Sequence, residues 1–296
     1  MNQTYMKEKK IFPLVMSMAL PMMLSMAFNS LYNIVDSYFV AKLSEDAMTA
    51  LSLVYPAQNL LTAVAVGFGV GVNAMISFYL GAQNQEKADK TATQGMELGV
   101  LHGVLLMILF LCGMNWFLGM FTKSDTVRAL GMEYSNVVFL FSTIVTGGIT
   151  LEKIFQAVGR MRATMVSMIA GFVTNIVLDP LLIFGIGPFP RMEIAGAALA
   201  TGIGQVITLL VYIIYYVLDP LPVKLRRTYL RPEGEICGKT YGIGIPATLN
   251  MALPSLLISA LNGILAAYSG AYVLVLGVYY KLQTFIYLPS FRASGH

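Results

Sequence analysis

Long apolar runs recur along the whole chain, and short polar segments separate each run from the next. A helix needs about 20 predominantly apolar residues to cross the hydrocarbon core of a bilayer. Many of the runs reach that length, so the pattern predicts an all-α, multi-pass membrane protein whose partner is the lipid bilayer. The predicted spans are residues 13–40, 51–80, 93–118, 127–155, 164–184, 195–218, 236–267 and 273–291.

The composition agrees with this prediction. Hydrophobic residues make up 57% of the chain and charged residues 11%, whereas soluble domains are about 25% charged. A globular enzyme is therefore a poor interpretation. The chain also lacks a phosphate-binding GxxxxGK[ST] loop and an HExxH motif, so nothing indicates ATP hydrolysis, a bound metal or another cofactor.

Basic residues are concentrated in the loops on one side of the predicted bundle. Because cytoplasmic loops carry an excess of Lys and Arg, this side is predicted to be cytoplasmic and to include the amino terminus, in a plasma or inner membrane. The net charge of +4 is spread over several segments, so we expect no nucleic-acid partner. The predicted cytoplasmic side holds Lys7, Lys9, Lys10, Lys87, Lys90, Arg160, Arg162, Lys224, Arg226, Arg227, Arg231 and Lys239, and the other side holds Lys42, Lys123, Arg128 and Arg191.

Two acidic residues, Asp36 and Asp179, lie inside predicted spans. A carboxylate at the centre of a bilayer costs at least about 2.5 kcal/mol, so such residues usually face a polar cavity and bind protons, ions or substrates. Both spans run outward, which places both acids in the outer third of the membrane. Thr201, on an inward-running span, is expected at a similar depth. These positions predict a proton or cation site.

Polar side chains share a helix face with each acid. Asn29, Asn33 and Asp36 are spaced i, i+4, i+7, and Asn175 and Asp179 are spaced i, i+4, so each set forms one stripe that faces protein or water. For the asparagines, simple hydrogen bonding between helices remains an alternative.

Two prolines interrupt the backbone hydrogen bonding of these spans. Pro180 follows Asp179 and leaves the carbonyl of Ile176 without its helical donor, and Pro21 is expected to bend the first span below its stripe. Both are candidate hinges.

Other polar residues within the spans are secondary candidates. Glu152 and Gln156 share one face near the predicted cytoplasmic end, where we expect a solvated or salt-bridged helix end rather than a transport site. For His102 we favour a packing role over a proton relay.

A sparse internal repeat links the start of the chain to its last third. ALPMMLSMAF around Pro21 resembles GIPATLNMAL around Pro246, an offset of 246 − 21 = 225, and the same offset pairs Gln58 with Gln283. Six spans lie between the copies, so both enter from the same side, as in parallel-repeat transporters. This predicts a six-helix lobe in residues 1–220. Residues 221–296 then form a linker and the first two helices of a second lobe, and we expect the chain to stop early in that lobe, at FRASGH.

These residues resemble the multidrug and toxic compound extrusion (MATE) family. The matching segments are LYNIVDSYFV with Asp36, GFGVGVNAMIS, LEKIFQAVGR, and TNIVLDPLLIFGIGPFP running into GAALATGIGQ, and the resemblance extends to about Leu288. It implies two six-helix lobes around a central cavity, a chain about four helices longer than this one, and export of organic cations and other amphipathic drugs. It also implies coupling to the influx of protons or sodium at positions matching Asp36, Asn175, Asp179 and Thr201.

The resemblance predicts a cation-coupled drug antiporter, in which Na+ could replace the proton at the Asp36/Asp179 site. Two acids in one apolar pocket are expected to share a proton, because burial and the first charge both oppose the second ionisation. Two alternatives stay open. One is a flippase of related fold for lipid-linked oligosaccharides, although a basic cavity would suit its anionic substrate better. The other is a truncated product that is inactive or depends on a partner.

Overall fold

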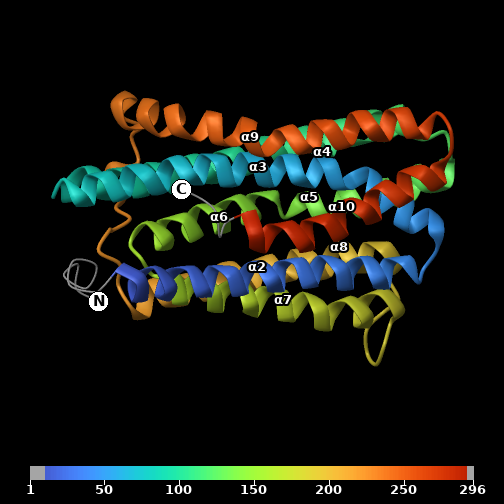
Figure 1. Cartoon of the computed structure of the whole chain (residues 1–296), viewed down its shortest axis with the longest axis horizontal. Coiled ribbons are helices and arrows are strands. Elements are labelled where there is room, and N and C mark those ends of the chain that lie inside the picture. The colour runs from blue at the N-terminus through green and yellow to red at the C-terminus, as the bar shows by residue number, and fades with distance from the viewer. Residues whose placement is uncertain (1–10, 292–296) are drawn as a thin grey trace.

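The computed structural model describes residues 11–291, which form long helices joined by short loops. Lys7, Lys9, Lys10 and the tail at 292–296, on which part of the topology and early-stop predictions rest, lie outside the described residues. The helices run along the long axis of the molecule, and their loops gather at its two ends (Figure 1). The elements are α2 (Ile11–Ala41), α3 (Glu45–Gly81), α4 (Gln85–Phe121), α5 (Asp125–Leu140), α6 (Ser142–Ala157), α7 (Met161–Phe184), α8 (Glu193–Leu218), the short 3₁₀ helix η1 (Arg227–Tyr229), α9 (Gly234–Ala266) and α10 (Gly270–Phe291).

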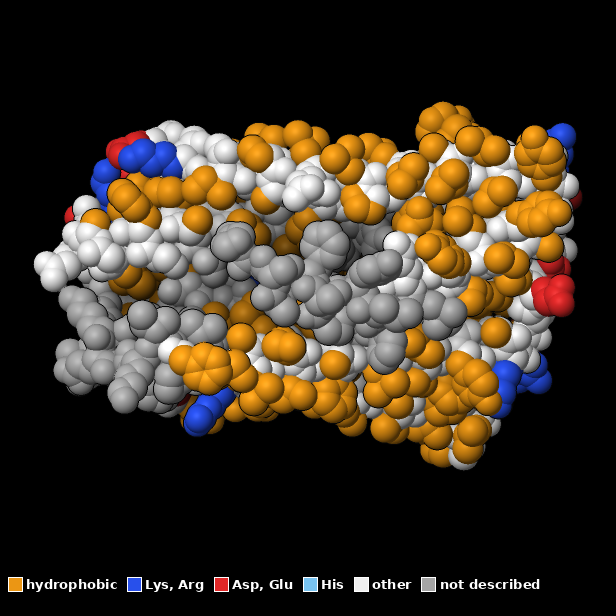
Figure 2. Space-filling view, viewed as in Figure 1, with side chains coloured by type: hydrophobic (Ala, Val, Ile, Leu, Met, Phe, Trp, Pro, Cys, Tyr) orange, Lys and Arg blue, Asp and Glu red, His pale blue; other side chains and the backbone are white. Residues whose placement is uncertain are grey.

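The helices are long and apolar enough to cross a membrane. In the described part of the chain, α3, α4, α7, α8 and α9 each meet the length and hydropathy requirement, and the pair α5 and α6 meets it jointly. Among the side chains coloured by type in Figure 2, apolar ones cover most of the visible face and charged ones lie mainly near its two ends. This distribution, together with the helical architecture, confirms the prediction of an all-α, multi-pass membrane protein.

The predicted fourth span, residues 127–155, corresponds to two helices, α5 and α6, that meet at a break. The chain bends by 48° between α5 and α6. Near the break, Ser142 Oγ donates to the carbonyl of Phe139 at 2.6 Å and Thr146 Oγ1 donates to that of Thr143 at 3.2 Å. Hydroxyls that bond back to the backbone, and neighbouring glycines such as Gly147, are common causes of helix kinks.

Side-chain caps define where three of the helices begin. Ser44, Asn84 and Ser124 accept hydrogen bonds from the backbone N–H groups at the starts of α3, α4 and α5, which satisfies donors that have no partner within the helix. Both α3 and α4 are 37 residues long, or about 55 Å at 1.5 Å per residue. They therefore extend past a hydrocarbon core of about 30 Å.

Helix α3 is the centre of the bundle and packs against α4, α5, α6 and α9. Its contact with α9 uses very small residues: a Cβ on Gly67 would lie 2.5 Å from Thr248 Cα, and one on Gly71 would lie 2.2 Å from the Thr240 carbonyl oxygen. Close backbone approach of this kind drives helix association where lipid replaces water. The division of the chain into residues 1–220 and 221–296 stays a prediction.

Candidate functional site

Close packing of α7 on α8 positions the candidate site. A Cβ on Gly171 would lie 2.6 Å from the carbonyl oxygen of Gly204, and one on Gly204 would lie 2.8 Å from that of Gly171. Real Cβ atoms essentially never come so close to other atoms, so only glycines permit this spacing. One helical turn beyond Gly171, the spacing brings the side chain of Asn175 to the surface of α8.

Asn175, Asp179 and Thr201 meet at this contact, as their predicted depth requires. Asn175 Nδ2 donates to Asp179 Oδ1 at 3.4 Å and to Thr201 Oγ1 at 3.3 Å. The exposed fractions are 2%, 0% and 8% for Asn175, Asp179 and Thr201, so the cluster is shielded from lipid and from solvent. Both bonds are long for N–H···O contacts, which are usually 2.7–3.2 Å.

Helix α2 adds Asp36 to the cluster. It packs along α7, and the ring of Tyr32 stacks on that of Phe172 with centroids 5.5 Å apart and planes 7° from parallel. Asp36 is buried and lies close enough to Asp179 for their charges to act on each other. The structure therefore brings together all four residues predicted for the coupling site, although their role stays a prediction.

Two further polar residues near the acids, Tyr32 and Tyr134, escaped the sequence analysis. Tyr32 lies within electrostatic range of Asp36, Asp179 and Thr201. Tyr134, on α5, is also within range of both acids, and its hydroxyl accepts a hydrogen bond from Gln58 Nε2 at 3.2 Å. Tyr32 precedes Asp36 by four residues, so helical spacing could have identified it. Tyr134 is one of several polar residues on α5, beside Glu133 and Ser135, and nothing in the sequence distinguishes it from them.

The secondary candidates lie elsewhere. Asn33 Nδ2 donates to the backbone carbonyl and to the side chain of Asn29, at 2.8 and 2.9 Å. At the other end of the bundle, Lys153 Nζ contacts Glu152 Oε1 and Gln156 Oε1, both at 3.0 Å. The Lys153 and Glu152 side chains are only 7% and 14% exposed. This helix end is therefore salt-bridged and not solvated.

The structure also describes the surroundings of the two prolines and of His102. Helices α2 and α7 both remain helical through Pro21 and Pro180, and their role as hinges stays a prediction. His102 Nε2 lies 3.0 Å from the Tyr241 hydroxyl and its ring contacts that of Phe68 edge to face. These contacts fit the packing role.

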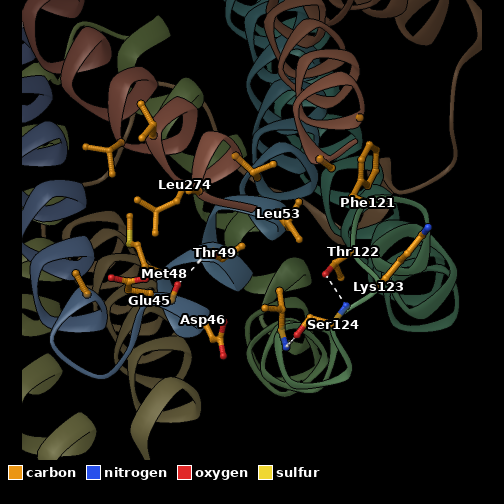
Figure 3. Close-up of a pocket in the computed structure, with 18 of the residues that line it drawn as sticks. Glu45, Asp46, Met48, Thr49, Leu53, Phe121, Thr122, Lys123, Ser124 and Leu274 are labelled. Carbon is orange, nitrogen blue, oxygen red and sulfur yellow. Dashed lines mark hydrogen bonds between the residues drawn. The ribbon is translucent and has the colours of Figure 1, made fainter. Parts of the chain in front are cut away.

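A cavity of about 1230 Å³ opens at the end of the molecule where α2 ends and α3 begins (Figure 3). Its walls are mainly apolar, and Glu45, Asp46 and Lys123 stand among them. On α2 it is lined by residues such as Ile34 and Ser37. At 100° per residue, Ile34 lies about 160° around the helix from Asp36, and Ser37 lies about 100° from it. Helix α2 therefore separates the cavity from the acid cluster and contacts both.

The chemistry of the cluster suits a small cation. The carbonyl oxygen of the Asn175 side chain and Asp179 Oδ2 are buried, and within the described part of the chain neither has a hydrogen-bond donor. Buried acceptor atoms rarely lack a hydrogen-bond donor. A bound proton or Na+ would satisfy both of these oxygens. In that same part of the chain, no three His, Cys, Asp or Glu residues are grouped as they are in a site for a multivalent metal.

A family model described as MatE matches residues 21–181. That is more than half of the chain, so the chain belongs to the MatE family, and the resemblance inferred from the sequence is confirmed. Among curated proteins it is 29% identical, over 282 residues, to the multidrug export protein MepA of Staphylococcus aureus (strain NCTC 8325 / PS 47). The MepA protein of Staphylococcus saprophyticus is 28% identical over 282 residues. These relatives are named export proteins, in agreement with the prediction that the chain is not an enzyme.

Solved structures share the fold. The inward-facing conformation of a multidrug resistance MATE family transporter superposes with a TM-score of 0.83 at 28% identity, covering 95% of this chain and 63% of that one. A MATE protein in complex with MaL6 gives 0.82 at 26% identity, covering 93% of this chain and 61% of that one. The chain covers 62% of the length of the MepA proteins, and the matched region takes in 95% of the chain.

Proposed function

We propose that this chain forms the coupling lobe of a cation-coupled multidrug exporter. One observation carries the proposal: Asp36, Asn175, Asp179 and Thr201 gather from α2, α7 and α8 into a buried cluster with acceptor oxygens that have no donor within the described part of the chain. The relatives of this chain are named multidrug export proteins, which supports a role in export. The four residues bind the coupling ion, a proton or Na+, in a bacterial cell membrane, with the amino terminus in the cytoplasm.

The drug is a small amphipathic cation that occupies the cavity beside α2. A volume of about 1230 Å³ is at the upper end of the range for ligand sites, which is about 300–1,000 Å³. The apolar walls suit the body of such a molecule, and Glu45 and Asp46 at the rim suit its charge.

Helix α2 connects ion binding to drug release. When both acids are charged, they repel each other, and the bundle is most stable with α2 placed so that Asp36 is far from Asp179. A proton or Na+ removes that repulsion and lets α2 approach α7, pivoting at Pro21. The same movement reshapes the cavity wall at Ile34 and Ser37. Coupling requires the drug to bind the two positions of α2 with different affinities.

Transport into proteoliposomes tests the proposal. The purified chain is reconstituted, a pH or Na+ gradient is imposed, and uptake of the organic cation tetraphenylphosphonium is measured. We expect gradient-driven uptake by the wild-type chain and its loss in Asp179→Asn. The control is Glu193→Gln, which removes an exposed acid at the same end of the bundle that does not line the cavity. If Asp179→Asn transports as fast as the wild type, Asp179 has no part in coupling.

A further inference from the structure

A second, smaller groove lies at the opposite end of the bundle, beside the first turns of α4. Its volume is about 310 Å³. Met96 and Val100 of α4 form one wall, and Leu225 and Leu230 of the segment between α8 and α9 form the other. The remaining lining residues are polar or charged: Thr93, Glu97, Arg226 and Arg227. The groove thus joins an apolar floor to charged groups.

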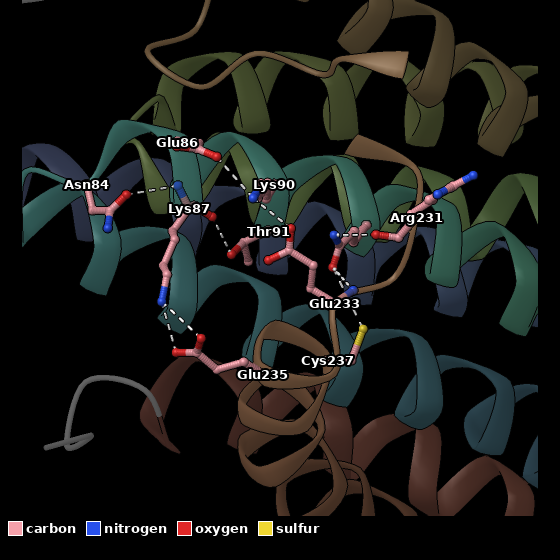
Figure 4. A network of polar contacts seen from close by, with 10 residues as sticks. Asn84, Glu86, Lys87, Lys90, Thr91, Arg231, Glu233, Glu235 and Cys237 are labelled. Carbon is pink, nitrogen blue, oxygen red and sulfur yellow. Dashed lines mark hydrogen bonds and ion pairs between the residues drawn. The ribbon is translucent and has the colours of Figure 1, made fainter. Parts of the chain in front are cut away.

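The segment that carries the two arginines is fixed to α4 by hydrogen bonds. Asp89 Oδ1 accepts from the backbone N–H of Lys224 at 2.9 Å, and Thr93 Oγ1 accepts from that of Arg226 at 3.1 Å. Gln94 Nε2 donates to the Arg231 carbonyl at 2.9 Å, and Figure 4 shows Arg231 close to the polar first turns of α4. The arginines are therefore held at a defined position instead of on a loose loop.

The two arginines have little internal compensation. Arg226 Nε lies 3.6 Å from Asp89 Oδ2, and 51% of the Arg226 side chain is exposed. Arg227 is exposed and forms none of the ion pairs found among residues 11–291. A fixed, solvated guanidinium is a strong recognition group for a phosphate, because its N–H groups can donate in pairs.

The apolar floor continues into the lipid-facing surface of α4. Val100 is followed on this helix by Leu101, Leu105 and Ile108, all of them about half exposed and on one side by helical spacing. The charged residues of α4 are confined to its first turns, up to Glu97. The groove therefore lies where the headgroups of a bilayer meet its acyl chains.

We propose that this groove is a binding site for an anionic phospholipid, phosphatidylglycerol. Its phosphate binds Arg226 and Arg227, the hydroxyls of its headgroup donate to Glu97, and one acyl chain lies over Met96 and Val100. Each part of the groove then has a partner. A soluble phosphate would leave the apolar floor unused, and the trimethylammonium group of phosphatidylcholine has no hydrogen to donate to Glu97.

Lipid titration of the full chain tests the site. The purified protein is held in an uncharged detergent, dioleoylphosphatidylglycerol or dioleoylphosphatidylcholine is added, and the apparent affinity is obtained from the rise in melting temperature. We expect phosphatidylglycerol to bind the wild type more tightly than phosphatidylcholine. Each arginine replaced by glutamine should weaken that binding about fivefold, since a basic residue at an anionic surface contributes about that factor.

Matched variants separate this site from general surface charge. Arg162→Gln removes an exposed arginine from the same end of the bundle and should change the affinity less than twofold, and Met96→Trp should block the acyl chain. If the double variant Arg226→Gln/Arg227→Gln has a lower melting temperature than the wild type without lipid, the single variant Arg227→Gln is used instead. The Arg227 side chain makes no ion pair within the described part of the chain, so its loss should not affect stability. The proposal is overturned if the arginine variants bind like the wild type, if Arg162→Gln weakens binding equally, or if phosphatidylcholine binds as well.

The lipid site is independent of the proposed transport activity. Asp179→Asn should leave phosphatidylglycerol binding unchanged, and Arg227→Gln should leave tetraphenylphosphonium binding unchanged. Failure of one proposal is thereby distinguished from failure of the other.

Discussion

The α7–α8 contact leads to a sharp prediction for Gly171→Ala. The new Cβ would lie 2.6 Å from the Gly204 carbonyl oxygen and 1.9 Å from Thr208 Oγ1. The Thr208 side chain can rotate away, but the Gly204 carbonyl belongs to the backbone. Since real Cβ atoms essentially never lie closer than 3.0 Å to such an atom, α7 and α8 must separate by at least about 0.4 Å. Overpacking of this kind costs about 1–3 kcal/mol of unfolding free energy.

The same separation should disconnect the candidate site. Asn175 Nδ2 reaches Thr201 Oγ1 across this contact at 3.3 Å, so a further separation of about 0.4 Å would exceed the hydrogen-bond limit of about 3.5 Å. A hydrogen bond between membrane helices contributes about 0.6 kcal/mol. We therefore expect Gly171→Ala to weaken the fold and to lower the affinity of the cluster for its ion.

Unfolding in mixed detergent micelles measures the first effect. The control is Gly113→Ala on α4, where a Cβ meets nothing within 4 Å and alanine is the better helix former. We expect this control to be at least as stable as the wild type. If Gly171→Ala is as stable as Gly113→Ala, the close packing of α7 on α8 does not hold the site together.

Three further predictions concern other parts of the molecule. Lys153→Met should lower the unfolding free energy in detergent by about 3–5 kcal/mol, because it leaves the buried Glu152 carboxylate without its cation. Adding Glu152→Gln should restore part of that loss. If the two substitutions lower the unfolding free energy additively, the prediction is contradicted. Asp89→Ala should speed tryptic cleavage between α8 and α9, because the backbone N–H of Lys224 loses its acceptor, whereas Glu86→Ala, which removes only a surface ion pair, should not. Trp116 is the single tryptophan and is 72% exposed near the end of α4. Its fluorescence should be quenched more by lipids labelled near the headgroup than by lipids labelled at the chain end. Stronger quenching by the chain-end label would show that the end of α4 does not lie near the membrane surface.

The sequence allowed the membrane class and the main site to be predicted because both depend on local patterns. Apolar runs of the required length define the spans, and a carboxylate within such a run is conspicuous whatever its neighbours. Asp36 and Asp179 were found in this way, and spacing of i, i+4 added Asn175. Thr201 followed from depth alone, since direction and rise fix height along a helix.

What the sequence did not reveal depends on contacts between distant segments. The bend between α5 and α6 results from hydroxyls that bond back to the backbone, as at Ser142, and the same hydroxyls occur in unbent helices such as α8, where Thr208 does so. The segment between α8 and α9 was predicted only as a basic loop, because its attachment to Asp89 joins residues 135 positions apart. The closeness of Tyr134 to the acids likewise depends on how α5 packs.

The central claim is that the buried acids exchange a cation for a cationic drug. The most direct test is the equilibrium affinity of the purified chain for tetraphenylphosphonium, measured by calorimetry over a range of pH at fixed Na+ and over a range of Na+ at fixed pH. If one ion leaves for each drug bound, linkage requires the dissociation constant to rise about tenfold for each tenfold rise in that ion, wherever the ion fills the site. The account predicts that dependence for the wild type and for Glu193→Gln, which lies outside the cavity, and its loss in Asp179→Asn. An affinity in the wild type that is insensitive to both pH and Na+, or an unchanged dependence in Asp179→Asn, would contradict it.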